Sequence, residues 1–92
     1  MTLFPGVIAR IFLHNEVVIS IPIETEHIRL SQLLKLANVV MDGAEAKFRI
    51  GNKEVRVNGE VEVRRGRKLR NGDLVEFEGE TYRIAALESA GQ

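Results

Sequence analysis

The sequence predicts one small α+β domain, and three patterns along the chain point to this fold class. Apolar residues alternate with other residues over positions 7–23, which is typical of β-strands. The apolar spacing becomes helical over 30–40, and short alternating runs separated by glycine turns follow from residue 55. With 92 residues, of which 45% are apolar, the chain is long enough to bury a single modest core.

Residues 7–23 are expected to form an N-terminal β-hairpin. Its two strands are defined by two alternating apolar sets, namely Val7, Ala9, Ile11 and Leu13, and then Val17, Ile19, Ile21 and Ile23. His14-Asn15-Glu16 separates the sets and suits a tight turn, because asparagine tolerates the left-handed backbone conformation. An exposed apolar hairpin would tend to associate with other apolar surfaces, so we expect it to pack on its own domain or on a second copy of the chain.

The stretch LSQLLKLANVV, residues 30–40, is predicted to form an amphipathic helix. Its apolar stripe has helical spacing and consists of Leu30, Leu33, Leu34, Ala37 and Val40. Ser31 is the predicted N-cap, since a serine oxygen can accept a backbone N–H of the first turn. The Met-Asp-Gly sequence that follows should end the helix.

Residues 43–50 allow two interpretations. Apolar residues alternate with charged ones here, in the order Ala44, Ala46, Phe48 and Ile50. This alternation favours a strand, with Phe48 in the core, whereas the content of alanine, glutamate and lysine favours a short helix. Periodicity alone leans towards the strand. The choice matters because Lys47 and Arg49 would point the same way on a strand and roughly opposite ways on a helix.

From residue 55 onwards the chain is predicted to be β-structure. Valines alternate with charged residues around an Asn-Gly pair, a strong hairpin signal, at Val55, Val57, Val61 and Val63. A two-residue loop would pair Val57 with Glu60 and split the valines between two faces. A three-residue loop with a bulge keeps them on one face and is the predicted arrangement. Further turns are expected at 71–73 and 78–80, and the residues after Glu88 should fray.

The charges are unevenly distributed although the chain has no net charge. From Arg29 to Arg70 there are eleven Lys/Arg and five Asp/Glu, an excess of six positive charges, and the remainder carries the opposite excess. The densest group has no acid within it and contains Arg64, Arg65, Arg67, Lys68 and Arg70. Like charges this close repel one another unless an anion covers them. The group therefore predicts a polyanion-binding surface, while the simpler alternative is a solvated charged loop.

Structured nucleic acid is the polyanion that the composition favours. Aromatic residues are scarce, and Phe48 and Phe77 occupy positions expected to lie in the core, so little is left for stacking on unpaired bases. Arginine contacts to the phosphates of a folded, double-helical nucleic acid fit better and would depend strongly on salt.

Catalytic and metal-binding patterns are not apparent in the sequence. There is no cysteine, the two histidines lie far apart, and no serine lies in a nucleophile motif. The sequence therefore predicts no enzyme, no metal and no cofactor. Charged residues interrupt the apolar N-terminal segment, and no apolar run approaches the length that crosses a bilayer, so a soluble cytoplasmic protein without membrane association is expected.

Residues from about 24 to 85 resemble an S4-type RNA-binding domain, in particular the small stand-alone bacterial proteins of the YaaA/YbcJ-like group. The resemblance is carried by IRLSQLLKLANVVMDGAEAK and VRVNGEVEVRRGRKLRNGDLVEF. It implies two short helices packed on a small, mostly antiparallel sheet (the S4-like αL motif), which makes 43–50 the second helix. The expected organisation is a β-hairpin extension at 1–23, an S4-like domain at 24–88 and a frayed tail at 89–92.

The resemblance also implies an RNA surface on the helix pair and the adjacent basic β-region. By matching position it indicates Lys35, Lys47, Arg64, Arg65, Arg67 and Lys68, and less firmly Gln32, Arg49 and Arg70. The expected function is non-catalytic binding of structured RNA, either ribosomal or transfer RNA, with ribosome association. The alternative is a protein-interaction module that docks an acidic partner and dimerises through the hairpin. A monomer or weak dimer is expected.

Overall fold

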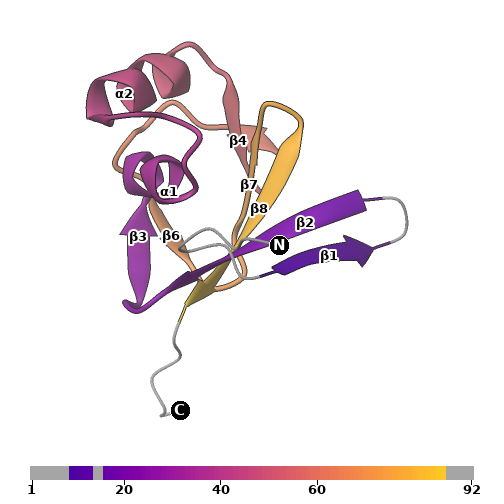
Figure 1. Cartoon of the computed structure of the whole chain (residues 1–92). Coiled ribbons are helices and arrows are strands. Elements are labelled where there is room, and N and C mark those ends of the chain that lie inside the picture. Colours follow the sequence, from indigo (N-terminus) through magenta and orange to yellow (C-terminus); the bar gives the residue numbers. More distant parts are fainter. Residues whose placement is uncertain (1–8, 14–15, 87–92) are drawn as a thin grey trace.

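The computed structural model describes residues 9–13 and 16–86, and these residues form two helices and eight strands (Figure 1). In chain order the elements are β1 (Ala9–Leu13), β2 (Glu16–Ile23), β3 (His27–Arg29), α1 (Leu30–Leu36), α2 (Gly43–Gly51), β4 (Val55–Val57), β5 (Glu60–Val61), β6 (Lys68–Arg70), β7 (Leu74–Phe77) and β8 (Glu80–Ala86). The predicted start of the hairpin at residue 7, most of its turn and the tail after Glu88 lie outside the described residues. The α+β fold class is confirmed.

The main sheet is mixed, with the strand order β1-β2-β8-β7-β4-β5. Its β2–β8 pair is parallel, and its other pairs are antiparallel, as expected of a mostly antiparallel sheet. Strands β3 and β6 form a separate antiparallel pair. Figure 1 shows both helices on the same side of the main sheet, with α1 between α2 and the β3–β6 pair.

The predicted hairpin is present as β1 and β2, which pair from Ala9–Ser20 to Leu13–Glu16. Strand β2 also belongs to the same sheet as the later strands, because it pairs in parallel with β8. Its alternate residues Ile19, Ile21 and Ile23 are buried in the core, as the alternation predicts. The division of the chain into a hairpin extension, an S4-like domain and a tail stays a prediction.

Helix α1 buries Leu30, Leu33 and Leu34 of its predicted apolar stripe, but it ends at Leu36 instead of residue 40, and Ser31 does not cap it. The helix begins at Leu30, two residues earlier than a cap at Ser31 would place it, and the cap residue is Arg29. The N–H of Leu30 donates to the carbonyl of Arg67 at 2.8 Å, and that of Ser31 to the carbonyl of Arg65 at 3.0 Å. The first N–H groups of the helix are thus satisfied by a loop far along the chain, which leaves no requirement for a hydroxyl cap.

Residues 43–51 form a helix, so the strand interpretation from periodicity is wrong and the composition and the resemblance gave the better prediction. The Asp42 carboxylate caps this helix by accepting the Glu45 N–H at 2.9 Å. Ala46 and Ile50 are buried, whereas Phe48 is 65% exposed. The prediction of a core Phe48 is wrong because it assumed alternation, and a helix turns by about 100° per residue.

The Asn58-Gly59 turn has two residues, so the predicted three-residue loop with a bulge is wrong. Val57 pairs with Glu60, and both turn residues have positive φ, 52° and 88°, as a tight hairpin turn of this type requires. The Asn58 side chain also accepts the Leu74 N–H at 3.0 Å, which ties the turn to β7. As a result the first two valines of the segment are buried and the last two, Val61 and Val63, are exposed.

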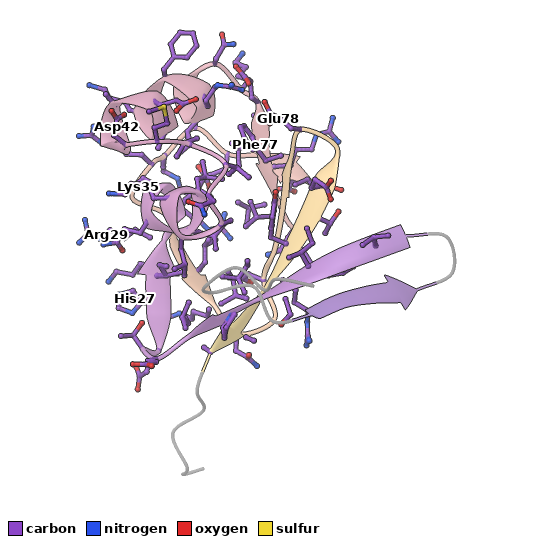
Figure 2. The ribbon with its side chains drawn as sticks, viewed as in Figure 1. His27, Arg29, Lys35, Asp42, Phe77 and Glu78 are labelled. Carbon is purple, nitrogen blue, oxygen red and sulfur yellow. The ribbon has the colours of Figure 1, made fainter. Side chains whose placement is uncertain are left out.

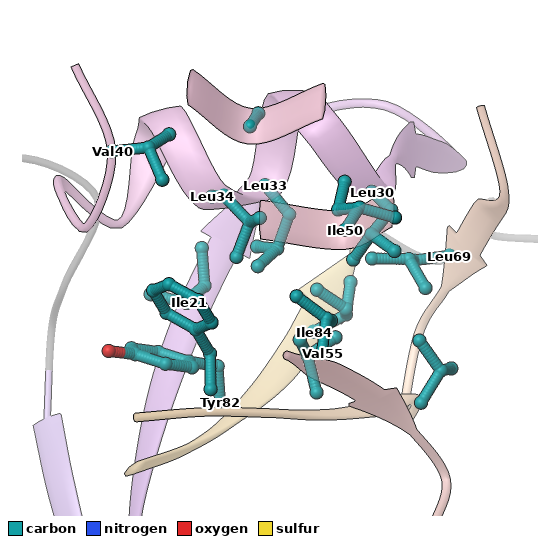
Figure 3. Packing of buried hydrophobic residues seen from close by; sticks show 14 of the residues in the cluster. Ile21, Leu30, Leu33, Leu34, Val40, Ile50, Val55, Leu69, Tyr82 and Ile84 are labelled. Atoms are coloured by element: carbon teal, nitrogen blue, oxygen red, sulfur yellow. The ribbon is translucent and has the colours of Figure 1, made fainter. Parts of the chain in front are cut away.

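The core lies between the helices and one face of the main sheet (Figure 3). Labelled core residues come from both layers and include Leu30, Leu33, Leu34, Ile50, Ile21, Val55, Tyr82 and Ile84. Leu69 of β6 joins the same cluster, so the small β3–β6 pair is anchored to the main core. This packing leaves the opposite face of β3 and β6 to solvent.

Candidate nucleic-acid interface

The β3–β6 pair carries basic residues on its solvent face. Its register joins His27 with Arg70, Ile28 with Leu69, and Arg29 with Lys68. Directly opposed residues of an antiparallel pair share a face, and neighbours along a strand alternate. Since Leu69 is fully buried, the other two pairs lie on the opposite face, where Arg29, Lys68 and Arg70 are exposed and His27 is half-buried. We call His27, Arg29, Lys68 and Arg70 the basic ribbon.

The residues Arg64 to Arg67, which we call the arginine turn, lie against the start of α1. The Arg67 N–H donates to the carbonyl of Arg64 at 3.2 Å and closes the turn. The carbonyls of Arg65 and Arg67 then accept the first N–H groups of α1, as described above. The turn leads directly into β6, so α1, the arginine turn and the basic ribbon form one continuous surface.

A buried carboxylate holds two residues of the arginine turn. The Glu62 side chain is only 7% exposed and accepts the Arg64 Nε–H at 2.9 Å and an Arg67 Nη1–H at 2.8 Å. It also accepts a second guanidinium N–H and the backbone N–H of Arg64, both at 2.9 Å. The Arg64 side-chain hydrogen bonds are the main reason that the pKa of Glu62 falls to about 2, although burial acts in the opposite direction.

Glu62 therefore supplies an anion within the protein for the charge cluster. Arg64 nevertheless keeps 71% of its side chain exposed, whereas Arg67 is more covered. Arg65 and Lys68 are exposed and form no ion pair with any residue that the structure describes. The cluster thus consists of two arginines positioned by a carboxylate and neighbouring cations without one.

Helix α1 adds Lys35 to this side of the molecule. Figure 2 shows His27, Arg29 and Lys35 along one side, below Asp42 at the start of α2. Lys35 is exposed and, within the described part of the chain, has no ion pair. Gln32 is exposed too, but its side-chain oxygen accepts the Arg29 N–H at 3.2 Å and so helps to begin the helix.

On α2, Lys47 and Arg49 lie on opposite flanks, because two residues advance a helix by about 200°. Lys47 is exposed. Arg49 donates to Glu54 at 2.7 Å and to Glu78 at 3.0 Å, and its guanidinium lies 5.4 Å from the centre of the Phe77 ring. The hydrogen bond to Glu54 is the largest cause of its raised pKa. These contacts give Arg49 a structural role that links α2 to β7.

The structure thus brings together most of the predicted site residues and adds two that the sequence did not indicate. Seven of the predicted residues lie on the surface formed by α1, the arginine turn and the basic ribbon, namely Gln32, Lys35, Arg64, Arg65, Arg67, Lys68 and Arg70. Lys47 lies on the neighbouring helix α2. Arg49 is paired with Glu54 and Glu78. Arg29 and His27 join the ribbon only through the pairing of β3 with β6. No local pattern marks that pairing. The assignment of these residues to RNA contact stays a prediction.

Over 9–13 and 16–86, no group of three or more His, Asp or Glu side chains is placed to hold a metal ion. None of the helices in this part of the chain has the length and apolar character needed to cross a membrane.

Comparisons with known proteins agree with the resemblance. The family model for the S4 domain matches residues 21–85. A Bacillus subtilis protein named probable ribosome maturation protein RlbA is 54% identical over 59 residues, which is 64% of this chain and 83% of that protein. An Escherichia coli protein named putative RNA-binding protein YbcJ is 38% identical over 60 residues, which is 65% of this chain and 86% of that protein. The chain therefore belongs to the S4-domain family.

Proposed function

We propose that this protein is a non-catalytic, ribosome-associated binder of structured RNA, either ribosomal or transfer RNA, that acts in the cytoplasm. The observation that carries the proposal is the continuous surface of exposed cations over α1, the arginine turn and the basic ribbon. The names of the two relatives, which mention RNA binding and ribosome maturation, support the same function.

The exposed cations of this surface can contact the phosphates of a folded RNA. Arg29 and Lys68 are direct neighbours across the ribbon. Arg65 lies against the first turn of α1, and Lys35 is in the last turn of the same helix. Such contacts recognise shape and charge rather than base sequence. Ion pairs with protein carboxylates do not occupy these four side chains within the described residues.

Glu62 contributes by preparing Arg64 for binding. A free arginine loses side-chain conformational entropy when it is held against a phosphate, and pre-organisation reduces that cost. Arg64 is already held through its Nε–H and through its backbone N–H, yet most of its side chain remains exposed. The Arg67 side chain is less exposed than that of Arg64. It therefore mainly stabilises the turn and contributes less to direct contact with RNA.

The salt dependence of binding tests the proposal. With about six phosphate contacts, the logarithm of the binding constant should fall against the logarithm of salt concentration with a slope of about −4 to −5. The triple variant Arg29→Ala, Arg65→Ala and Lys68→Ala should lose affinity by about 10- to 100-fold, and the slope should become shallower by about 2 to 3.

A matched control removes three exposed cations from elsewhere, namely Lys53, Arg56 and Arg83. Arg56 and Arg83 alternate with buried neighbours in β4 and β8, so they lie on the sheet face that points away from the helices. Changing all three to alanine alters the net charge equally and should leave RNA affinity nearly unchanged. Equal losses in both triple variants, or a binding constant that ignores salt, would refute the proposal.

Ribonuclease treatment separates RNA binding from the alternative function as an acidic-protein docking module. Nucleic acid that co-purifies with the full chain and is removed by ribonuclease supports the proposal. An acidic protein partner that survives ribonuclease but is lost from the Arg29, Arg65 and Lys68 variant would show that the same surface binds protein.

A further inference from the structure

The outer face of α2 presents an aromatic ring to solvent. Phe48 is 65% exposed, whereas Phe77 and Tyr82 are buried. Ala44 and Gly51, one helical turn away on either side, are too small to cover the ring. Together with Lys47 and Asn52 these residues line a shallow hollow. An aromatic face that the core does not use is therefore available to a ligand.

The charge around this ring is positive on one flank. Lys47, the residue immediately before Phe48, is exposed and forms no ion pair within the described residues. The nearest acid on the helix, Glu45, lies on the other flank, where it accepts the Met41 N–H at 2.8 Å and lies 3.7 Å from Arg49. The ring and its lysine thus offer a flat apolar surface beside a free cation.

The ring belongs to the helix that packs against α1, which is part of the proposed RNA surface. Helix α2 packs on α1, which carries Lys35, and Figure 2 places Asp42, the cap of α2, on the same side as Arg29 and Lys35. An RNA that lies along the basic ribbon and α1 can therefore continue onto α2.

We propose that Phe48 and Lys47 form a subsite for an unpaired nucleotide of the bound RNA. The base stacks on the Phe48 ring, and the Lys47 ammonium contacts the adjoining phosphate. Stacking tolerates any base because every base has a π face. This inference rests on the proposed function and narrows the ligand to a structured RNA that presents an unpaired nucleotide beside its helical part.

Two RNA probes test the subsite with the full-length chain. One is a fully paired RNA duplex, and the other is the same duplex closed by an unpaired loop. Phe48→Leu keeps an apolar side chain at this exposed helical position but removes the aromatic face. It should weaken binding to the looped RNA by about 5- to 100-fold and leave duplex binding unchanged. Phe48→Tyr keeps an aromatic ring at this position and should bind the looped RNA with the affinity of the unchanged protein.

A second measurement locates the contact directly. A 5-bromouridine in the loop should crosslink under ultraviolet light to the peptide that contains Phe48. Val61→Ala, which trims another exposed apolar side chain on the edge strand β5, is the matched control and should bind both probes like the unchanged protein. The salt slope should be the same for Phe48→Leu as for the unchanged protein, since no phosphate contact is lost.

The outcomes separate this inference from the proposed function. If Phe48→Leu binds both probes normally, or loses both equally, the subsite is refuted even when the Arg29, Arg65 and Lys68 variant shows the expected loss. If that triple variant binds both probes normally, the proposed function fails first. A Phe48→Leu protein that binds RNA normally but loses a co-purifying protein would assign this face to protein contact and overturn the inference.

Discussion

Two arginine–carboxylate clusters in this molecule have the same chemistry and opposite arrangements. In the arginine turn the Glu62 carboxylate is only 7% exposed, and the Arg64 side chain is 71% exposed. At the end of the main sheet the Arg49 side chain is 26% exposed, and the Glu78 side chain that it contacts is 54% exposed. The first cluster therefore exposes a cation, Arg64, to solvent, and the second exposes an anion, Glu78. Ion pairs alone therefore do not indicate which sign a surface carries, because burial decides which partner is displayed.

The largest expected effect comes from removing the buried member of the first cluster. Glu62→Ala leaves Arg64 and Arg67 without their shared acceptor and opens a gap beneath the turn. The free energy of unfolding should fall by about 2–3 kcal/mol, less than for a fully buried pair because Arg64 can turn to water. Chemical denaturation measures this loss. A change below about 0.5 kcal/mol would mean that Glu62 does not hold the turn.

Acid should reproduce part of that loss in the unchanged protein. The pKa of Glu62 is lowered from 4.5 to about 2 in the folded state, so its contribution is fully present above pH 5 and is lost as the pH falls through this range. By pH 3 about 2 kcal/mol of the Glu62 contribution should have gone. Because other carboxylates also titrate, the measurement is the difference in unfolding free energy between the unchanged protein and Glu62→Gln. That difference should shrink with acid, and a constant difference would contradict the prediction.

The second cluster should respond through stability alone. Arg49→Ala removes the link from α2 to Glu54 and Glu78, so the melting temperature should fall, by less than for Glu62→Ala because these groups are more exposed. RNA affinity should stay within about twofold, since the Arg49 side chain is only 26% exposed and lies against Glu54 and Glu78 instead of on the α1, turn and ribbon surface. Melting curves and the binding assay with the looped RNA check both halves. A marked loss of RNA affinity would show that Arg49 contacts RNA and would contradict the prediction.

The smallest expected effect is at Gly66 in the arginine turn. Its φ is not in the left-handed region, and a Cβ atom there would meet nothing within 4 Å. Gly66→Ala should therefore change the unfolding free energy by less than about 1 kcal/mol. Gly59→Ala is the contrasting control, because its φ of +88° strains any other residue and stability should fall. If Gly66→Ala lowers RNA affinity without lowering stability, RNA approaches the backbone of the turn.

The wrong loop length predicted for the Asn58-Gly59 turn also led to a wrong expectation for Glu62 in the candidate interface. The predicted three-residue loop would have placed Val61 and Val63 inside and turned Glu62 towards solvent. The two-residue turn shifts the segment by one side-chain position, so the valines are exposed and Glu62 is buried. The buried carboxylate that organises the arginine turn was therefore missed for the same reason that the bulge was wrongly predicted.

The sequence by itself determined the features that depend on residues close together in the chain. These include the α1 segment with its core leucines, the position of the Asn58-Gly59 turn, the β-structure that follows, and the dense group of cations. Periodicity and turn chemistry are local properties, so they can be recognised without a structure.

Only the tertiary structure decided which charges the molecule displays. Arg29 and His27 join the ribbon through the pairing of β3 with β6, Glu62 is buried beneath the turn, and Arg49 is drawn to the end of the main sheet. The exposure of Phe48 likewise depends on which face of α2 packs on the core. Each outcome depends on contacts between residues distant in the chain, and local spacing carries no information about which distant partner a side chain meets.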